Sequence, residues 1–546
     1  MERVKAGIGI GTSRSRFFHL FFHRFEFFPS FCYSDFLMRD RTITLKAPLL
    51  QMIALLAVMT SVRELSAGEG APVEWTLQGA IRIALQNNVD ARVETENVSL
   101  REALIGQEIG QFDPTLRLEA RSDRSVRGST SLVETGFTAA SRFEQENQRI
   151  DAGLQQRFRW GGNYDLSLGQ VRSSATLQEI NPTLRGTALL TFTQPLLRGF
   201  GREAAEGPLR IARSDYAISQ SAFKSAVMAV ILEVSQTYWD LVFHRENVKI
   251  QRQTLQAAQQ LLEVNRAKVG LGLLAPIEIL VAESGVASRE EGVVIAEKGV
   301  RDTEDQLRRL LNFPEQSATE APEILPVDPP EENEKTFDEK TLLETALNRR
   351  PEIEQNRLQL ENRALAIRIA QNQLFPSLDL VGSVGRNGLG GNYSDEIDQL
   401  RSGDFYQWEA GLVLTFPLGN RAAKAALQKE QAEWNRAALA REKVRQQVAL
   451  ETKEGLRRVR TDFQRIATTR RARALAEKKL SAGNERFNLG LISSHDLLEF
   501  QNESADARGK ELKAVTDYNK SLANLEKVTG LLSDRYPISA APEAPR

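Results

Sequence analysis

The feature that most constrains the fold of this chain is an internal repeat. Residues 75–118 align without a gap on residues 337–380, at a constant offset of 262 positions. A second ungapped alignment, at an offset of 218, places Leu271-Gly272-Leu273 on Leu489-Gly490-Leu491. The chain is therefore predicted to contain two copies of one unit. Because the two offsets differ by 44, the first copy has 44 additional residues between the aligned blocks.

Each copy is predicted to contain a pair of very long helices. Residues 209–275 and 418–536 contain no Pro, and the apolar positions of the first stretch recur with the seven-residue spacing of a coiled coil. A helix over residues 204–269 would be about 100 Å long, which is more than a globular domain needs. The second copy repeats this helix over residues 421–487, and a return helix is expected over residues 494–529.

Short segments of both copies alternate between apolar and polar residues, as strands with one apolar face do. We find six candidate strands, of which residues 154–160 and 164–171 lie within the additional residues of the first copy. Alternation alone is equally compatible with a soluble, half-buried sheet. Aromatic residues at the strand ends, Tyr406 with Trp408 and Trp160 with Tyr164, favour a membrane barrel instead. The clearest apolar positions are Leu116, Leu118, Ala120, Tyr406, Trp408, Ala410, Leu412, Leu414 and Phe416.

The N-terminal residues are typical of a secretory signal. We expect residues 1–37 to precede the true start at Met38, which is followed by basic residues, the apolar run 47–62 and the small residues Ser66-Ala67-Gly68. A membrane anchor is the alternative, but this run is shorter than the roughly 20 residues that a membrane span needs. The remaining chain would carry 62 Lys and Arg against 67 Asp and Glu and no later transmembrane helix.

These observations predict five segments. They are an N-terminal extension with a signal peptide (1–67), a first repeat (68–312), a Pro/Glu-rich linker (313–336), a second repeat (337–530) and a disordered tail (531–546). Within the second repeat, the Gly-rich residues 382–391 are predicted to form a surface loop between two strands.

The residues that catalysis or metal binding would need are scarce. After Met38 the chain has only two His residues, His244 and His495, and no Cys, and no serine lies in a Gly-x-Ser-x-Gly segment. We therefore expect no catalytic residues, no metal site and no cofactor. Lys and Arg total 71 against 72 for Asp and Glu, without a basic block, so nucleic acid is not an expected partner.

At this point the residues resemble the TolC-like outer membrane efflux protein family. The resemblance covers Trp75 to Gly530, and its specificity comes from the order of several short motifs, which occur twice. The matching segments are Thr76–Asn88, the Pro-x-Leu-x-Leu strand starts, Thr193–Gly199, Thr237–Leu241 and Leu489–Leu498.

The resemblance implies a mainly α-helical protein with membrane β-structure. Three copies would form one outer-membrane β-barrel continuous with a long periplasmic α-helical barrel, with two internal repeats per chain. Family members commonly contribute four strands per copy, whereas this sequence has six candidates. The implied function is an exit duct in the outer membrane, without enzymatic activity, for a tripartite efflux pump or a type I secretion system. Its implied partners are the lipid bilayer, a periplasmic adaptor protein and an inner-membrane transporter.

Two other function classes have different sequence signatures. A periplasmic coiled-coil spacer would lack amphipathic strands with aromatic ends. A secreted enzyme with a helical domain would show converging catalytic side chains.

Two groups of candidate functional residues follow. The turns of the two helical hairpins place apolar residues at the far ends of the long helices, and the resemblance suggests that they dock the adaptor. These tip residues are Leu271, Gly272, Leu273, Leu489, Gly490 and Leu491. The resemblance also places a periplasmic gate at Asp496 and Glu499. The alternative is that both carboxylates simply favour the positive end of a helix.

Overall fold

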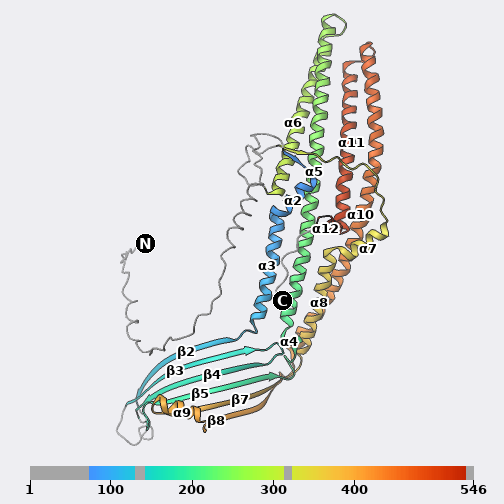
Figure 1. Ribbon diagram of the computed structural model, residues 1–546. Helices are drawn as coiled ribbons and strands as arrows, with labels where there is room; N and C mark the ends of the chain where they lie inside the picture. Colours follow the sequence, from blue (N-terminus) through green and yellow to red (C-terminus); the bar gives the residue numbers. More distant parts are fainter. Residues whose placement is uncertain (1–72, 129–141, 177, 313–322, 537–546) are drawn as a thin grey trace, which may run out of the picture. The chain divides into compact units, whose positions relative to one another are not determined.

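The computed structural model describes residues 73–128, 142–176, 178–312 and 323–536, and the structural statements below concern these residues (Figure 1). The expected N-terminal extension and signal peptide lie outside them. Within them, the repeat is visible element by element. The first copy contains α2 (Leu77–Asn87), α3 (Val89–Gly110), α5 (Gly207–Gly270) and α6 (Ile277–Leu311). The second contains α7 (Glu339–Arg349), α8 (Pro351–Asn372), α10 (Arg421–Asn488) and α11 (Ser494–Val528).

Matching elements of the two copies have matching lengths and starts. Helices α2 and α7 have 11 residues each, α3 and α8 have 22, and α6 and α11 have 35. Both short helices begin at a polar N-cap, because the Thr76 hydroxyl accepts from the Gly79 N–H and the Asp338 carboxylate accepts from the Thr341 N–H. The predicted repeat is thus present in the structure.

The long helices have nearly the predicted bounds. At about 1.5 Å per residue, the 64 residues of α5 and the 68 residues of α10 extend over about 95 and 100 Å. Helix α5 packs along α6, and α10 packs along α11, so each copy forms one long hairpin. By length and composition α5 is also apolar enough to cross a membrane. Its apolar residues Val227, Ile231 and Leu241 are buried in the core instead.

The main core lies where α2, α5 and α6 meet, and it contains residues such as Ile81 and Leu307 that are fully buried. Strand β1 (Val73–Trp75) pairs there in parallel with β6 (Ile324–Pro326). One expectation needs correction at this point. The tail expected to be disordered from residue 531 contains α12 (Leu532–Arg535), whose Leu532 is 1% exposed. The predicted Pro/Glu-rich linker (313–336) contains β6. Both segments carry an apolar residue that the core buries.

The remaining strands form a six-stranded antiparallel sheet in the order β2-β3-β4-β5-β7-β8 (Figure 1). The strands are β2 (Thr115–Gly128), β3 (Arg142–Arg157), β4 (Asn163–Ala175), β5 (Thr183–Pro195), β7 (Ser377–Gly390) and β8 (Tyr406–Thr415). Five of the strands therefore have at least 13 residues. The hairpin β3–β4 accounts for the additional residues of the first copy.

The predicted loop at residues 382–391 is wrong, because residues 382–390 form most of β7. Two of the glycines, Gly388 and Gly390, are explained by α9 (Tyr393–Ser402), which packs on β5 and β7. A Cβ atom at Gly186 or Gly388 would overlap atoms of Glu396 on that helix. Glu396 also accepts a hydrogen bond from Gln170 Nε2 at 2.9 Å. Glycine at these positions lets the helix pack closely against the sheet. In the sequence alone, the Gly-rich composition of this segment resembled that of a loop.

Candidate functional site

The sheet has one apolar face and one polar face. Residues directly opposite each other in neighbouring strands lie on the same face, so the register assigns every side chain. Most large apolar residues that are exposed on the strands lie on one face, and they are Leu116, Leu118, Ile150, Leu168, Leu190, Leu380, Val384, Trp408, Leu412 and Leu414. Leu389 and Val413 lie on the other face, and the apolar face also carries Arg124, Glu144, Glu146 and Arg172 at the strand ends far from the β3–β4 turn. The other face carries Arg117, Glu119, Arg121, Arg149, Asp151, Asp165 and Glu409. An apolar surface of this extent is not left in water by ordinary soluble proteins.

Aromatic residues lie at both ends of the apolar face. Tyr406 and Trp408 are exposed at the start of β8. At the opposite end of the strands, Trp160 in the β3–β4 turn stacks on Phe158 with ring centroids 5.0 Å apart and lies 5.9 Å from Phe192. The expected placement of aromatic residues at the strand ends is therefore present. This pattern of an apolar band between aromatic ends is typical of strands in an outer membrane.

The two hairpin tips have the same backbone geometry. At the first, Gly272 has φ +74°, its N–H donates to the Val269 carbonyl, and the Leu273 N–H donates to the Lys268 carbonyl at 2.9 Å. At the second, Gly490 has φ +72° and the equivalent bonds are present. This is the Schellman arrangement, which needs a residue with positive φ, and glycine adopts it at no steric cost.

The tips present leucines to solvent. Leu271, Leu273, Leu489 and Leu491 are between 63% and 75% exposed, although each is a large apolar residue. The backbone geometry places them there, because each tip glycine, with its positive φ, ends the helix and lies between two of these leucines. The structure thus brings the six predicted tip residues into two equivalent turns.

Behind the tips the two hairpins hold each other. Phe487 is buried among Leu261, Leu497 and Leu498. The Lys268 ammonium lies 4.3 Å from the centre of the Phe487 ring and donates to the Phe487 carbonyl at 3.3 Å. Asn265 Nδ2 donates to the Ser494 hydroxyl at 2.8 Å. These contacts join the hairpin of the first copy to that of the second.

Arg289 of α6 also reaches α11. Its guanidinium donates to the Leu498 carbonyl at 3.2 Å and to Asn502 Oδ1 at 2.7 Å. The close approach of the two helices depends on Gly285, where a Cβ would come within 2.9 Å of Leu498. Burial lowers the pKa of the Arg289 guanidinium, which nevertheless remains charged at physiological pH. Sequence reasoning missed Arg289, because an Arg on a long helix carries no local signal of its burial.

The two carboxylates predicted at the gate have different surroundings. Asp496 completes a capping box with Ser493: its carboxylate accepts from the Ser493 hydroxyl at 2.7 Å and from the Ser493 N–H at 3.0 Å. These hydrogen bonds lower the pKa of Asp496. Glu499 is exposed and borders a cleft between α6 and α11 that also includes Arg289 and His495. Asp496 therefore has at least a local role in starting α11.

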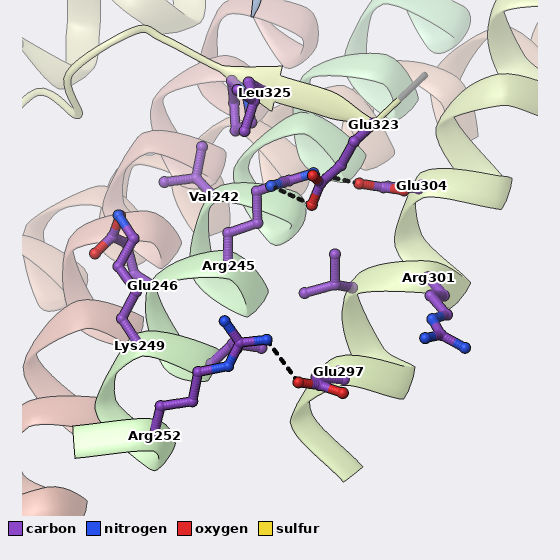
Figure 2. Close-up of a pocket in the computed structure, with 13 residues that line it drawn as sticks. Val242, Arg245, Glu246, Lys249, Arg252, Glu297, Arg301, Glu304, Glu323 and Leu325 are labelled. Atoms are coloured by element: carbon purple, nitrogen blue, oxygen red, sulfur yellow. Dashed lines mark hydrogen bonds and ion pairs between the residues drawn. The ribbon is translucent and has the colours of Figure 1, made fainter. Parts of the chain in front are cut away.

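A second cleft lies between α5, α6 and β6 and serves to hold these elements together. Figure 2 shows Arg245 between Glu304 and Glu323, with the Glu323 oxygen at 2.9 Å, and Arg252 paired with Glu297 at 2.7 Å. The lining contains four basic and four acidic side chains, so it offers no net charge to a ligand. No group of three or more His, Cys, Asp or Glu within the described ranges is arranged to hold a metal ion.

Comparison with known proteins gives the decisive observation. The chain matches the family described as outer membrane efflux protein over residues 80–312 and 342–531, which is most of its length. The chain belongs to the outer membrane efflux protein family. This efflux protein is thus an outer-membrane channel with a large periplasmic helical part, and the alternative of a periplasmic spacer is not favoured.

Two curated relatives are similar to this efflux protein. Nodulation protein T of Rhizobium leguminosarum bv. trifolii is 24% identical over 439 residues, which cover 76% of this chain and 87% of the relative. The pyoverdine export outer membrane protein OpmQ of Pseudomonas aeruginosa is 24% identical over 354 residues, which cover 62% and 69% of the two chains.

Solved structures show the same fold. The outer membrane channel CmeC of Campylobacter jejuni superposes with a TM-score of 0.63 at 17% identity, covering 83% of this efflux protein and 85% of CmeC. The outer-membrane channel OprN gives a TM-score of 0.63 at 17% identity, covering 83% and 89% of the two chains.

Proposed function

We propose that this efflux protein works as a homotrimeric exit duct of a tripartite efflux pump or a type I secretion system. In this proposal it receives cargo from an inner-membrane transporter, binds a periplasmic adaptor at its hairpin tips and performs no catalytic step. The observation that carries the proposal is the exposed apolar face of the sheet, with aromatic residues at both ends. Such a face is stable in lipid and costly in water.

Several copies are needed because one sheet cannot close on itself. A lipid-embedded sheet has to leave no open edge, and barrels close with about eight strands or more, whereas the described part of this chain supplies six to the sheet. The long helices support the same conclusion. Helices of about 100 Å are stabilised by neighbours along their whole length, and one hairpin pair leaves much of each helix surface exposed.

The adaptor would dock at the tips. Four leucines lie in two identical turns, and an apolar partner surface would bury them. We expect the double variant Leu273→Asp/Leu491→Asp to lose export while still forming trimers in the outer membrane. Since both leucines are exposed, Asp there leaves the fold intact. The matched variant Leu273→Met/Leu491→Met keeps an apolar surface and is expected to export normally. Normal export by the Asp variant would remove the tips from the docking surface.

The gate is proposed at Asp496 and Glu499. In a trimer these residues would form two rings of three carboxylates each, about one helical turn apart. Rings of acidic side chains favour cations and bind multivalent ones. In single-channel recordings we expect Asp496→Asn/Glu499→Gln to weaken cation selectivity and to abolish block by a trivalent cation.

The capping box supplies the control for this experiment. Ser493→Ala removes the hydroxyl contacts between Ser493 and Asp496 but keeps the backbone N–H contact and both carboxylates, so selectivity and block should persist. If Ser493→Ala and the charge-neutral double variant behave alike, or if the double variant keeps its selectivity and its block, the carboxylates act only at the start of α11.

A further inference from the structure

We infer that this protein builds a barrel of 18 strands, six from each of three copies, because the β3–β4 hairpin is an integral part of the sheet. The inference rests on the proposed trimer and adds how wide its membrane part is. The resemblance to the family implies four strands per copy and hence 12 in all, so the hairpin distinguishes this chain.

The register shows that the hairpin is inserted between the two outer strands of the first copy. β2 pairs with β3 continuously from Thr115 opposite Gln155 to Gly128 opposite Arg142. β3 then pairs with β4, and β4 pairs with β5, so that β2 and β5 are separated by two full strands. A hairpin that folded away from the sheet would instead leave β2 beside β5.

The side chains of the hairpin continue both faces of the sheet. Leu154 lies between Leu116 of β2 and Leu166 of β4, and Leu166 lies opposite Leu190 of β5. These residues form one apolar row across four strands. On the polar face, Asp151 lies opposite Glu119. A strand with this alternation can face lipid on one side and water on the other. The register places both strands of the hairpin in this orientation.

The turn of the hairpin is also fixed to its neighbours. The Gly201 N–H donates to the Trp160 carbonyl at 3.3 Å, and Gln156 Nε2 donates to the Phe112 carbonyl at 3.0 Å. Gly161 has φ +99°, and a Cβ there would come within 2.5 Å of the Gly199 carbonyl oxygen. The turn therefore packs against the segment that connects β5 to α5, as an element of the sheet would.

The free edges identify the partner as a second copy of this chain. β2 and β8 are the two edge strands, and among the described residues neither has a second neighbour. All neighbouring strands are antiparallel and the sheet has an even number of them, so β2 and β8 run in opposite directions. β8 of one copy can therefore pair antiparallel with β2 of the next and continue the apolar face. Barrel diameter grows roughly linearly with strand number, so 18 strands give a barrel about 1.5 times as wide as 12.

A deletion variant gives a matched narrow barrel. Removing residues 129–176 takes out the hairpin and joins β2 to the segment before β5. Ala120 and Gly186 already lie on the same face, since Ile150 and Gln170 connect them across the sheet. Electron cryomicroscopy of the full-length protein purified from outer membranes should show 18 strands, and the deletion variant should show 12 with a diameter about one third smaller.

Disulfide mapping in the full-length chain tests the same point if the deletion variant does not assemble. The only Cys of the sequence is Cys32. Once Cys32 is replaced by Ser, any disulfide that forms must join two introduced cysteines. Leu118→Cys/Ala152→Cys should form a disulfide within one chain, because these residues lie opposite each other in β2 and β3. Leu118→Cys/Ala188→Cys should not, because β3 and β4 lie between the two positions. A 12-stranded full-length trimer, or the reverse disulfide pattern, overturns the inference and leaves the exit duct standing. Recovery of a protein that forms no trimer in the outer membrane overturns the proposed function as well.

Discussion

Two adjacent residues of β8 test which face of the sheet contacts lipid. Leu412 and Val413 are 64% and 51% exposed, and because successive residues of a strand point to opposite sides, Leu412 lies on the apolar face and Val413 on the polar face. The two variants Leu412→Arg and Val413→Arg therefore place the same charge at nearly the same height on opposite sides of the sheet.

The expected difference between these variants follows from the position of Leu412. It lies four residues from Trp408, which at about 3.3 Å per residue puts it roughly 13 Å along the strand from the aromatic end and near the middle of a band about 25 Å tall. Arg facing lipid at mid-depth costs about 2–4 kcal/mol per copy. Arg at an exposed position in water changes the free energy of unfolding by about 0.5 kcal/mol or less.

The assay is denaturant unfolding of the protein folded into lipid vesicles, with the amount of trimer in outer-membrane fractions as the cellular counterpart. We expect Leu412→Arg to lower the free energy of unfolding by about 2–4 kcal/mol per copy and Val413→Arg to leave it nearly unchanged. Equal losses in the two variants, or no loss in either, would refute the assignment of the apolar face to lipid.

Two further predictions concern local structure. Gly388→Ala introduces a Cβ that overlaps the Glu396 carbonyl, so we expect α9 to leave the sheet and trypsin to cleave faster after Arg401, whereas cleavage at an unchanged rate would show that α9 is not held there. The Ser493 contacts lower the pKa of Asp496, so the stability that Asp496 contributes is present above its ordinary pKa of about 4 and is lost as the pH falls through the lowered value. The difference in thermal stability between the native protein and Ser493→Ala should therefore shrink in acid, and a difference independent of pH would contradict this.

The long-range order of the fold was predictable wherever a residue pattern repeats. The two Pro-free stretches and their seven-residue spacing gave the bounds of α5 and α10 within a few residues, because side chains on a helix surface have to keep the helical period. The alternation of apolar and polar residues indicated six strands for the same reason, although the candidate at residues 154–160 covers only the end of β3 (Arg142–Arg157). The capping box was not predicted, although Ser493 and Asp496 have the spacing of three residues that it requires.

Contacts between distant residues were not predictable in this way. Arg289 meets Asn502 across 213 positions, and neither residue lies in a pattern that indicates burial. The glycines of β7 were interpreted as a loop because glycine disfavours strands, and the position of α9 explains Gly388 and Gly390. The capping role of Asp496 could be read locally, whereas its role in a channel depends on neighbouring copies of the chain.

In the proposed channel, three copies of the chain place the apolar faces of their sheets in the outer membrane. The most direct measurement is native mass spectrometry of the protein extracted from separated outer membranes in a mild detergent. We expect the protein to be recovered in the outer-membrane fraction, with a mass that corresponds to three copies of the chain. Recovery as a monomer from the soluble periplasmic fraction would contradict it.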